Sequence, residues 1–501
     1  MVLIDKAYDN YISNNDCLTL FPIDFITKYN CIAYAVDNEK LIVLINQDFS
    51  LFDYNKLYYF TEQKIELCLV NNDIWDKIFK LIEVSNSRSN AMFKYQNNKE
   101  ELNYKVLKED VTTFYRAEVS NAPIVKLLDS IIEEAITIKS SDIHIEPMFD
   151  QIKVRFRIDG KLVDDSTLPI ESMNEISNRL KVIANLDITK KHLPQDGKII
   201  YKLNDKEYDI RLSVLPTIYG ERFALRILDT NNQYFTIDKL QFSDNAKPRI
   251  DEMLEMKSGL VLVVGPTGSG KSTTLKSILL ANKERNENII TVEDPVEYTI
   301  EGISQTQINE ESGLTFANAL RTILRQDPNI IMVGEIRDME TAKIACRASI
   351  TGHLVYSTLH TINSYGVINR LIDMGVEKFL LLDSLKVIIS QRLIRLLCNN
   401  CKIAYMSDKE ETKFLELEEA INLYKPCGCP KCSFTGYSGR RGVYEVVTID
   451  EDFRKIIIDG KNSTKFYQLL KKKKIETLFE NGRNLVVDGL SSIEELKSVI
   501  S

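Results

Sequence analysis

The feature that most constrains the fold is a glycine-rich segment in the middle of the chain. Residues 265–272 read Gly-Pro-Thr-Gly-Ser-Gly-Lys-Ser and match the pattern G-x-x-x-x-G-K-[ST] at every position. The wholly apolar run 260–264 precedes this segment and predicts a buried strand, and residues 273–282 predict a helix after it. A strand, a glycine loop and a helix in this order predict a phosphate-binding loop in a parallel α/β domain.

The motif assigns a chemical role to each part of the loop. Backbone N–H groups around the glycines surround an anion, and the helix N-terminus adds positive charge. We expect Lys271 to reach the β- and γ-phosphates of ATP and the Ser272 hydroxyl to ligate Mg²⁺. The candidate nucleotide-binding residues are Gly265, Pro266, Thr267, Gly268, Ser269, Gly270, Lys271, Ser272 and Thr273.

Two carboxylates follow other predicted strands. Glu335 comes after the apolar residues 330–333, and Glu293 ends the run 289–293. The carboxyl ends of parallel strands form the edge where α/β proteins bind ligands. Either glutamate can orient the water that attacks the γ-phosphate, so we take Glu335, Glu293 and Lys271 as catalytic candidates.

Two pairs of residues are candidate phosphate sensors. His353 and His360 flank a predicted strand at 354–357, so that one histidine lies on each side of it. Arg321 and Arg325 lie four residues apart, on one face of a predicted helix. For the histidines the alternative is an ordinary core or surface role, and for the arginines it is a pair of surface cations.

Five of the nine cysteines fall between residues 398 and 432. Cys398 and Cys401 form one C-x-x-C pair, and Cys429 and Cys432 form another, which is the spacing of a structural Cys₄ zinc site. Cys427 is too close to Cys429 for a usual ligand pair. The alternative is a set of reduced, metal-free thiols.

Charge and hydropathy exclude other classes of protein. The net charge is -8, which argues against a general nucleic-acid binder. The mean hydropathy is -0.17, and no apolar run approaches the roughly 20 residues that span a bilayer. Asp5 and Asp9 occupy the region where a secretory signal would have an uncharged core. We expect a cytoplasmic protein that meets a membrane only through partners.

The pattern along the chain predicts several domains. Runs at 32–36 and 41–45 predict two strands of a small N-terminal domain. The alternation of Lys153, Arg155 and Arg157 with apolar residues predicts a strand with one charged face. The expected parts are an N-terminal domain (1–97), a linker (98–121), a second domain (122–240), an ATPase core (241–393), a zinc segment (394–442) and a helical subdomain (443–501).

Taken together, these motifs resemble the secretion ATPases that assemble type IV pili and drive type II secretion, over nearly all of the chain from Ala122 onward. The matching segments are 140–147 and 193–197 of the second domain, the Walker A loop 265–272, the aspartate box 291–298, the Walker B segment 324–338, the histidine box 351–361, and the zinc segment 428–432 with 436–440.

This resemblance implies a RecA-like P-loop domain of α/β class, preceded by a PAS-like α+β domain and a small N-terminal α+β domain, with a Cys₄ zinc insertion. It implies a homohexamer in which Arg211 and Arg226, matching family positions, contact phosphate. It further implies an integral-membrane platform protein and a cytoplasmic docking protein as partners, at the inner membrane.

The sequence departs from the family at two places. Asn329 stands where the family usually has Asp, and the short N-terminal region lacks the Arg-Leu-Gly motif with which some relatives bind cyclic di-GMP. Two other functions remain as alternatives: a nucleotide-gated scaffold with little turnover, and a nucleic-acid translocase on a RecA-like core, against which the acidity of the chain argues.

Overall fold

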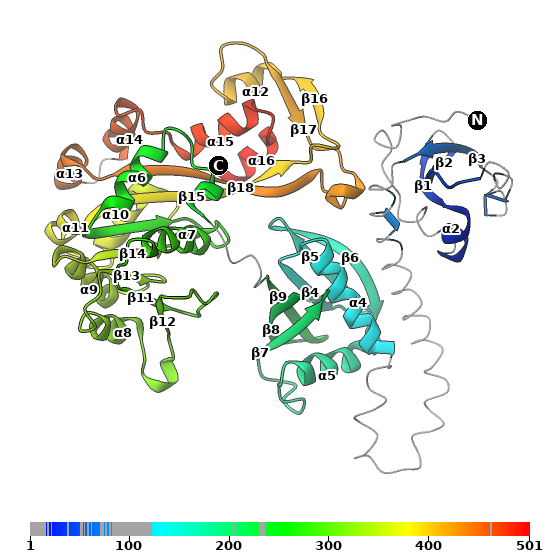
Figure 1. Cartoon of the computed structure of the whole chain (residues 1–501), viewed down its shortest axis with the longest axis horizontal. Helices are drawn as coiled ribbons and strands as arrows, with labels where there is room; N and C mark the ends of the chain where they lie inside the picture. Colours follow the sequence, from blue (N-terminus) through cyan, green and yellow to red (C-terminus); the bar gives the residue numbers. More distant parts are fainter. Residues whose placement is uncertain are drawn as a thin grey trace. The chain divides into compact units, whose positions relative to one another are not determined.

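The computed structural model describes residues 123–500 except 205, 230–235 and 461–462. In the N-terminal region it describes 17, 20–21, 23–37, 40–50, 54, 56–57, 60–61, 63–70, 75, 78–79 and 82, so the expected linker 98–121 lies outside the described residues. The chain divides into two compact units (Figure 1): the first is Met1–Asn231 with Cys398–Lys402 and Pro426–Ser438, and the second is the remainder.

A small sheet forms the N-terminal domain. Helix α2 (Ile23–Tyr29) is followed by β1 (Cys31–Asp37), β2 (Lys40–Ile45) and β3 (Lys64–Leu69), in the order β1-β2-β3. Strands β1 and β2 are antiparallel, which confirms the predicted pair, and β2 and β3 are parallel. Trp75, the one tryptophan of the sequence, is buried in this core.

The second domain is a six-stranded antiparallel sheet with two helices. Its strands lie in the order β6-β5-β4-β9-β8-β7. The elements are α4 (Pro123–Thr137), β4 (Asp142–Pro147), β5 (Gln151–Ile158), β6 (Lys161–Pro169), α5 (Met173–Ile183), β7 (Gln195–Leu203), β8 (Lys206–Thr217) and β9 (Gly220–Asp229). Ile152, Val154 and Phe156 are buried in the core that includes α4 and α5. The predicted alternation in β5 is therefore confirmed, and the opposite face of the sheet is charged.

The second unit contains a seven-stranded sheet in the order β12-β11-β13-β14-β10-β15-β18 (Figure 1). The first six of these strands run parallel. The strands are β10 (Gly259–Val264), β11 (Ile289–Glu293), β12 (Ser304–Gln307), β13 (Ile330–Val333), β14 (Leu354–Leu359), β15 (Leu385–Leu397) and β18 (Tyr437–Thr448). The parallel α/β prediction is confirmed.

Helices pack on both faces of this sheet because its strands are apolar on both sides. Leu260, Leu262 and Val264 belong to one core, and Val261 and Val263 belong to the other. One face carries α6 (Lys247–Glu255) and α7 (Lys271–Lys283). The other carries α8 (Phe316–Ile323), α9 (Met339–Ile350), α10 (Ser364–Asp373), α11 (Lys378–Ser384), α13 (Glu451–Ile458) and α14 (Ser463–Lys472).

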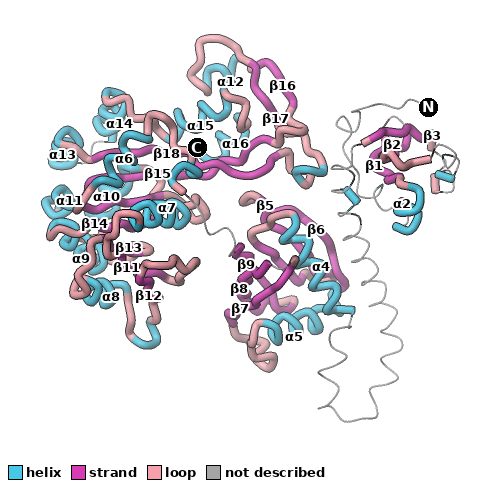
Figure 2. Tube along the Cα trace, in the orientation of Figure 1, coloured by secondary structure: helices cyan, strands magenta, loops and turns pink. Residues whose placement is uncertain are grey.

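The last strand of the sheet begins inside the segment that the sequence assigned to zinc. Residues 437–442 open β18, because the strand continues through the buried run 443–447, in which Glu445 is the one charged residue, and completes the edge of the sheet. Between β15 and β18 the chain forms a separate antiparallel pair of strands, with a helix between them in the sequence (Figure 2). The elements of this region and of the C-terminus are β16 (Ile403–Met406), α12 (Lys409–Phe414), β17 (Asn422–Lys425), α15 (Leu478–Val487) and α16 (Ile493–Ile500).

Among the described residues, no helix is both long enough and apolar enough to cross a membrane.

The second domain contains a fully buried ion pair, which gives a first prediction. Lys181 Nζ lies 2.6 Å from Glu221 Oε1, and Lys181 is 0% exposed. Substituting Lys181 by Met should destabilise this domain by about 3–5 kcal/mol, because Glu221 would be left buried without a cation. The measurement is hydrogen–deuterium exchange of peptides from α5 and β9 along a urea series.

The matched control is Lys153→Met, which breaks the exposed pair with Asp164 (2.7 Å). An exposed pair contributes less than about 1 kcal/mol. Equal losses in the two variants would contradict the prediction.

Candidate active site and metal centre

The phosphate loop lies between the end of β10 and the start of α7, as the sequence predicts. Gly270 precedes α7 with a φ of 86°, in the left-handed region that favours glycine. A Cβ atom on Gly270 would lie 2.8 Å from Gln391 Nε2, and one on Gly265 would collide with Gln391 O. Both glycines are therefore required by the close approach of β15, which places Gln391 beside the loop.

Lys271 is buried at the start of α7 and points back into the loop. Its Nζ donates to Gly265 O (2.9 Å) and Pro266 O (3.0 Å). Burial lowers the pKa of Lys271, and the charge of Glu335 opposes this shift. No carboxylate forms an ion pair with this ammonium in the described part of the chain. The loop thus holds a buried cation whose charge is available to a phosphate.

Glu335 lies just beyond β13, at the same edge of the sheet as the loop. Glu335 Oε2 lies 3.3 Å from His360 Nε2, and Arg337 donates to Oε1. Arg337 also donates to Asp294 Oδ2 (3.0 Å), and its bond to Glu335 raises the pKa of the guanidinium. The carboxylate is therefore held by a histidine on one oxygen and an arginine on the other.

The sequence prediction did not include Arg337 and Asp294. Their contact joins the end of β13 to the end of β11. It can therefore be foreseen from the order of the strands in the sheet but not from a local sequence pattern. Arg337 follows Glu335 by two residues and Asp294 follows Glu293 directly. The signals available in the sequence were this proximity to the two candidate carboxylates and the position of both residues inside the family segments 291–298 and 324–338.

Glu293 ends β11 and is fixed by neighbouring polar groups. Its Oε1 accepts from Thr291 Oγ1 (2.6 Å) and from Gln305 Nε2 (3.0 Å). Lys276 of α7 is buried nearby, with its Nζ 4.0 Å from the centre of the Tyr298 ring. Burial lowers the pKa of Lys276, and the charge of Glu293 opposes this shift.

The two candidate histidines lie at opposite edges of the sheet. His360 follows β14 at the carboxyl edge, beside Glu335, whereas His353 precedes β14 at the amino edge. His353 Nδ1 contacts Ala348 O (3.0 Å) and the residue lines a cavity of about 220 Å³ away from the loop. The structure therefore brings His360, but not His353, together with the phosphate-binding residues.

Arg321 is exposed in the last turn of α8, whereas Arg325 is exposed in the turn that follows the end of this helix at Ile323, so the two do not share one helix, contrary to the prediction from the sequence. Arg321 pairs with Glu340 of α9, and Arg325 donates to Arg321 O (3.0 Å). Neither contacts the phosphate loop within the described residues. This arrangement matches the alternative of surface cations in this chain.

Asn329 lies at the start of β13, far along the strand from Glu335. Its Oδ1 accepts the N–H of Asn288 (2.8 Å), and its own N–H donates to Asn288 O (2.9 Å). This pair joins the amino ends of β11 and β13. The substitution of the family's usual Asp by Asn329 therefore removes a negative charge from the amino edge of the sheet. The phosphate loop lies at the opposite, carboxyl edge.

Arg211 and Arg226 face each other on β8 and β9 in the second domain. Arg226 Nε donates to Asp142 Oδ1 (3.3 Å), and Asp142 also pairs with Arg157 (3.5 Å). The two arginines belong to the first unit, whereas the phosphate loop belongs to the second. Contact between these arginines and nucleotide therefore stays a proposal.

The four predicted zinc ligands converge. The Sγ atoms of Cys398, Cys401, Cys429 and Cys432 all lie within 4.8 Å of one another and are buried, whereas Cys427 is exposed and outside the group. Three Sγ–Sγ distances are 3.8 Å. Tetrahedral ligation with Zn–S of about 2.3 Å requires a separation of about 3.8 Å, so the donor set is compatible with zinc.

Main-chain groups complete the surroundings of the thiols. The N–H of Gly428 donates to Cys401 Sγ (3.3 Å), and the N–H groups of Cys429 and Gly436 donate to Cys432 Sγ (3.2 Å each). Such donors stabilise thiolates and orient them toward a cation.

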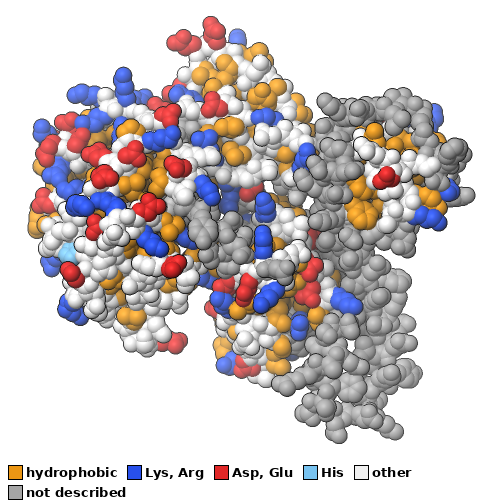
Figure 3. Space-filling view, viewed as in Figure 1, with side chains coloured by type: hydrophobic (Ala, Val, Ile, Leu, Met, Phe, Trp, Pro, Cys, Tyr) orange, Lys and Arg blue, Asp and Glu red, His pale blue; other side chains and the backbone are white. Residues whose placement is uncertain are grey.

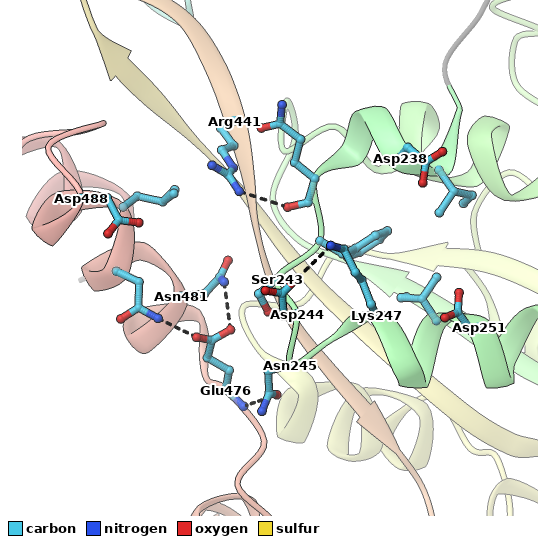
Figure 4. A pocket seen from close by; sticks show the side chains of 16 residues that line it. Asp238, Ser243, Asp244, Asn245, Lys247, Asp251, Arg441, Glu476, Asn481 and Asp488 are labelled. Atoms are coloured by element: carbon cyan, nitrogen blue, oxygen red, sulfur yellow. Dashed lines mark hydrogen bonds and ion pairs between the residues drawn. The ribbon is translucent and has the colours of Figure 1, made fainter.

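A larger cavity of about 790 Å³ lies elsewhere in the second unit (Figure 4). It is lined by α6, by Arg441 and by α15, and contains no residue of the phosphate loop. In its lining, Lys247 pairs with Asp244 (2.8 Å), and Asn481 donates to Glu476 (3.0 Å). This cavity is not the nucleotide site.

The fold and the site define the class of the protein. A parallel sheet that presents a phosphate loop and a candidate catalytic carboxylate at one edge is the arrangement of a RecA-like P-loop ATPase. The ATPase DotB from Legionella pneumophila has the same fold, with a TM-score of 0.56 at 22% identity, covering 74% of this chain and 94% of that one.

Sequence comparison then assigns the family. The family model described as "Type II/IV secretion system protein" matches residues 117–498, and the chain belongs to this family. It is 38% identical to the type II secretion system ATPase E of Vibrio cholerae over 481 residues, which cover 92% of this chain and 94% of the relative. It is 44% identical to the type IV pilus assembly ATPase PilB of Thermus thermophilus over 383 residues, 76% of this chain and 43% of the relative. The chain is an ATP hydrolase of the secretion and pilus ATPases, as the resemblance implied.

The position of Asn329 gives a second prediction. Asn329→Asp should leave steady-state ATP hydrolysis within about twofold of the unchanged protein, because an aspartate oxygen can also accept the Asn288 N–H at the edge remote from phosphate. The measurement is phosphate release with Mg-ATP. A large gain or loss of turnover would show that position 329 influences the residues at the carboxyl edge of the sheet, beside the phosphate loop.

Proposed function

We propose that this chain forms a homohexamer that hydrolyses ATP to power assembly of a type IV pilus or a type II secretion pseudopilus. The observation that carries this proposal is the edge of the sheet that holds the phosphate loop, here called the catalytic edge. Lys271 lies in the loop there, and the charge of the Glu335 carboxylate, which is held by His360, acts on it. The names of the relatives support the setting, since one is a secretion ATPase and the other a pilus assembly ATPase.

The proposed reaction is in-line attack of water on the γ-phosphate. Glu335 orients the water and accepts its proton, while His360 and Arg337 keep the carboxylate directed toward the loop. Lys271 leaves its two carbonyl partners for phosphate oxygens and stabilises the developing charge. Glu293, held by Thr291 and Gln305, is a second acidic group at the same edge.

The residues also fit a magnesium ion. Ser272 is exposed at the start of α7, where its hydroxyl can ligate Mg²⁺ that arrives with ATP. Bound Mg²⁺ would neutralise phosphate charge and fix the nucleotide for attack. An oxygen donor set with acidic neighbours suits this hard cation better than a soft one.

Arg211 and Arg226 are proposed to reach phosphate from the second domain. Asp142 holds the Nε of Arg226 and leaves the far end of its guanidinium directed outward, since the side chain is 59% exposed. Loss of the γ-phosphate would remove the anion that these arginines bind and so release the domain to rotate. Arg321 and Arg325 are exposed and His353 is partly exposed, so we assign these three residues to contacts with a neighbouring subunit of the proposed hexamer rather than to phosphate sensing.

The proposed partners follow from the family. Rotation of the domains would act on an integral-membrane platform protein, and the N-terminal domain (1–97) would dock a cytoplasmic component of the complex. The protein would thus lie in the cytoplasm at the inner membrane. On the face seen in Figure 3, Lys and Arg side chains are interspersed with Asp and Glu, which does not favour a nucleic-acid translocase.

Hydrolysis supplies the third prediction. Lys271→Ala and Glu335→Gln should each lower phosphate release by at least about 100-fold, because each removes a group that acts in the transition state. Activity should elute in a hexamer-sized fraction on size exclusion. Nucleotide binding without turnover in every fraction of the unchanged protein would favour the nucleotide-gated scaffold, and DNA-stimulated turnover would favour the translocase.

The cysteine cluster supplies the fourth prediction, which rests on a proposed structural zinc ion. The purified protein should contain about one zinc ion per chain by elemental analysis, and Cys432→Ser should lose it and lower the melting temperature, since four thiolates close the coordination sphere. Cys427→Ser is the matched control, because Cys427 lies outside the cluster. Equal zinc content in the two variants would contradict the assignment.

A further inference from the structure

A buried arginine, Arg392, lies beside the phosphate loop and forms no ion pair with a carboxylate among the described residues. Burial lowers the pKa of Arg392, and the charge of Glu445 opposes this shift. Arg392 is 9% exposed and follows Gln391 on β15. Strand β15 pairs with β10 up to Ser390 and Val264, so Gln391 and Arg392 continue alongside the loop itself. Within the described residues Arg392 makes no ion pair, although burying an unpaired charge is unfavourable.

The contacts of Arg392 connect the two halves of the catalytic edge. One guanidinium nitrogen, Nη1, donates to Gln391 O (3.1 Å), the carbonyl that lies against Gly265. The other, Nη2, donates to Ile362 O (2.6 Å) in the loop that follows β14. This loop begins with His360, which contacts Glu335, and ends at Asn363, which caps α10.

Gln391, the residue before Arg392, contacts the helix α7 that follows the phosphate loop. Its Oε1 accepts from Thr274 Oγ1 of α7 (2.8 Å), three residues after Lys271. Two adjacent residues of one strand therefore hold the phosphate-loop helix and the histidine loop, respectively. The position of His360 relative to Lys271 is set by this pair.

We propose that Arg392 is a positioning residue for ATP hydrolysis, which holds the histidine loop (360–363) against the phosphate loop so that His360 stays on Glu335. The proposal rests on the catalytic roles proposed for Glu335 and His360. The planar guanidinium suits this task because it can donate to two carbonyls in fixed directions. A lysine at this position keeps the charge but has one ammonium nitrogen, which cannot span the two carbonyl groups in the same way.

The buried charge also adds to the electrostatics of the loop. The positive charge of Arg392 contributes to lowering the pKa of Lys271, and burial lowers the pKa of Arg392 itself. Two buried cations at one edge favour a phosphate group. The charge and the geometry of Arg392 are therefore separable contributions, and the experiment must separate them.

The experiment compares Arg392→Lys, Arg392→Met and His360→Ala by steady-state phosphate release and by ADP binding. For Arg392→Lys we expect kcat to fall about 10-fold while the ADP Kd changes by less than about threefold, because charge is kept and positioning is lost. Arg392→Met should lower kcat further and weaken ADP binding. In the Arg392→Met variant, the backbone amides of residues 360–363 should exchange faster with deuterium, because the histidine loop has lost the contact that holds it.

A double-mutant cycle tests whether Arg392 acts through His360. The variant with both Arg392→Lys and His360→Ala should be no slower than the slower single variant, within about threefold. Independent, multiplied effects would overturn the proposal. So would an Arg392→Lys variant with unchanged kcat, which would leave charge as the whole contribution. The lysine variant keeps the test available if Arg392→Met does not fold.

Arg395→Met is the matched control on the same strand. Arg395 is also mostly buried, and it pairs with Glu495 of α16 (2.6 Å). It should lower stability and leave kcat of the folded protein within about threefold. If the unchanged protein is inactive, or if the Glu335→Gln variant is active, the proposed catalytic roles are refuted. This outcome does not depend on Arg392.

Discussion

The close approach of β15 to the phosphate loop is the constraint on which the site depends. Gln391 occupies the space that a side chain at Gly265 or Gly270 would need, so both positions must be glycine. The same approach lets Gln391 hold α7 through Thr274. The backbone conformation that exposes N–H groups to phosphate is thus fixed from outside the loop, by a strand that follows it by more than a hundred residues.

Local patterns in the sequence predicted much of this architecture. The strand–loop–helix unit around Lys271 is encoded by adjacent residues, and the four zinc-compatible cysteines are encoded by spacing. The histidines illustrate the limit. In the sequence, His353 and His360 both flank the strand β14 and cannot be told apart. In the structure they lie at opposite ends of this strand, so His360 reaches Glu335 and His353 does not.

Longer-range pairing accounts for what the sequence did not predict. Arg337 joins Glu335 to Asp294 across two strands, and Asn329 faces Asn288 at the opposite end of the same strands. In the second domain, β4 places Glu146 between Arg155 and Arg222, at 2.7 and 2.6 Å. The contacts of Arg337 with Asp294 and of Asn329 with Asn288 each join residues about 40 positions apart, so they become visible only when the register of the sheet is known.

The order of the strands has a consequence for synthesis of the protein. Strand β18, the edge of the ATPase sheet, is formed by residues 437–448, and Arg395 of β15 pairs with Glu495 near the end of the chain. During translation the phosphate loop therefore leaves the ribosome long before the strands and helices that complete its domain. Until the C-terminal residues are synthesised, the edge strand of the ATPase sheet has no partner. A nucleotide that binds before then binds to an incompletely folded domain.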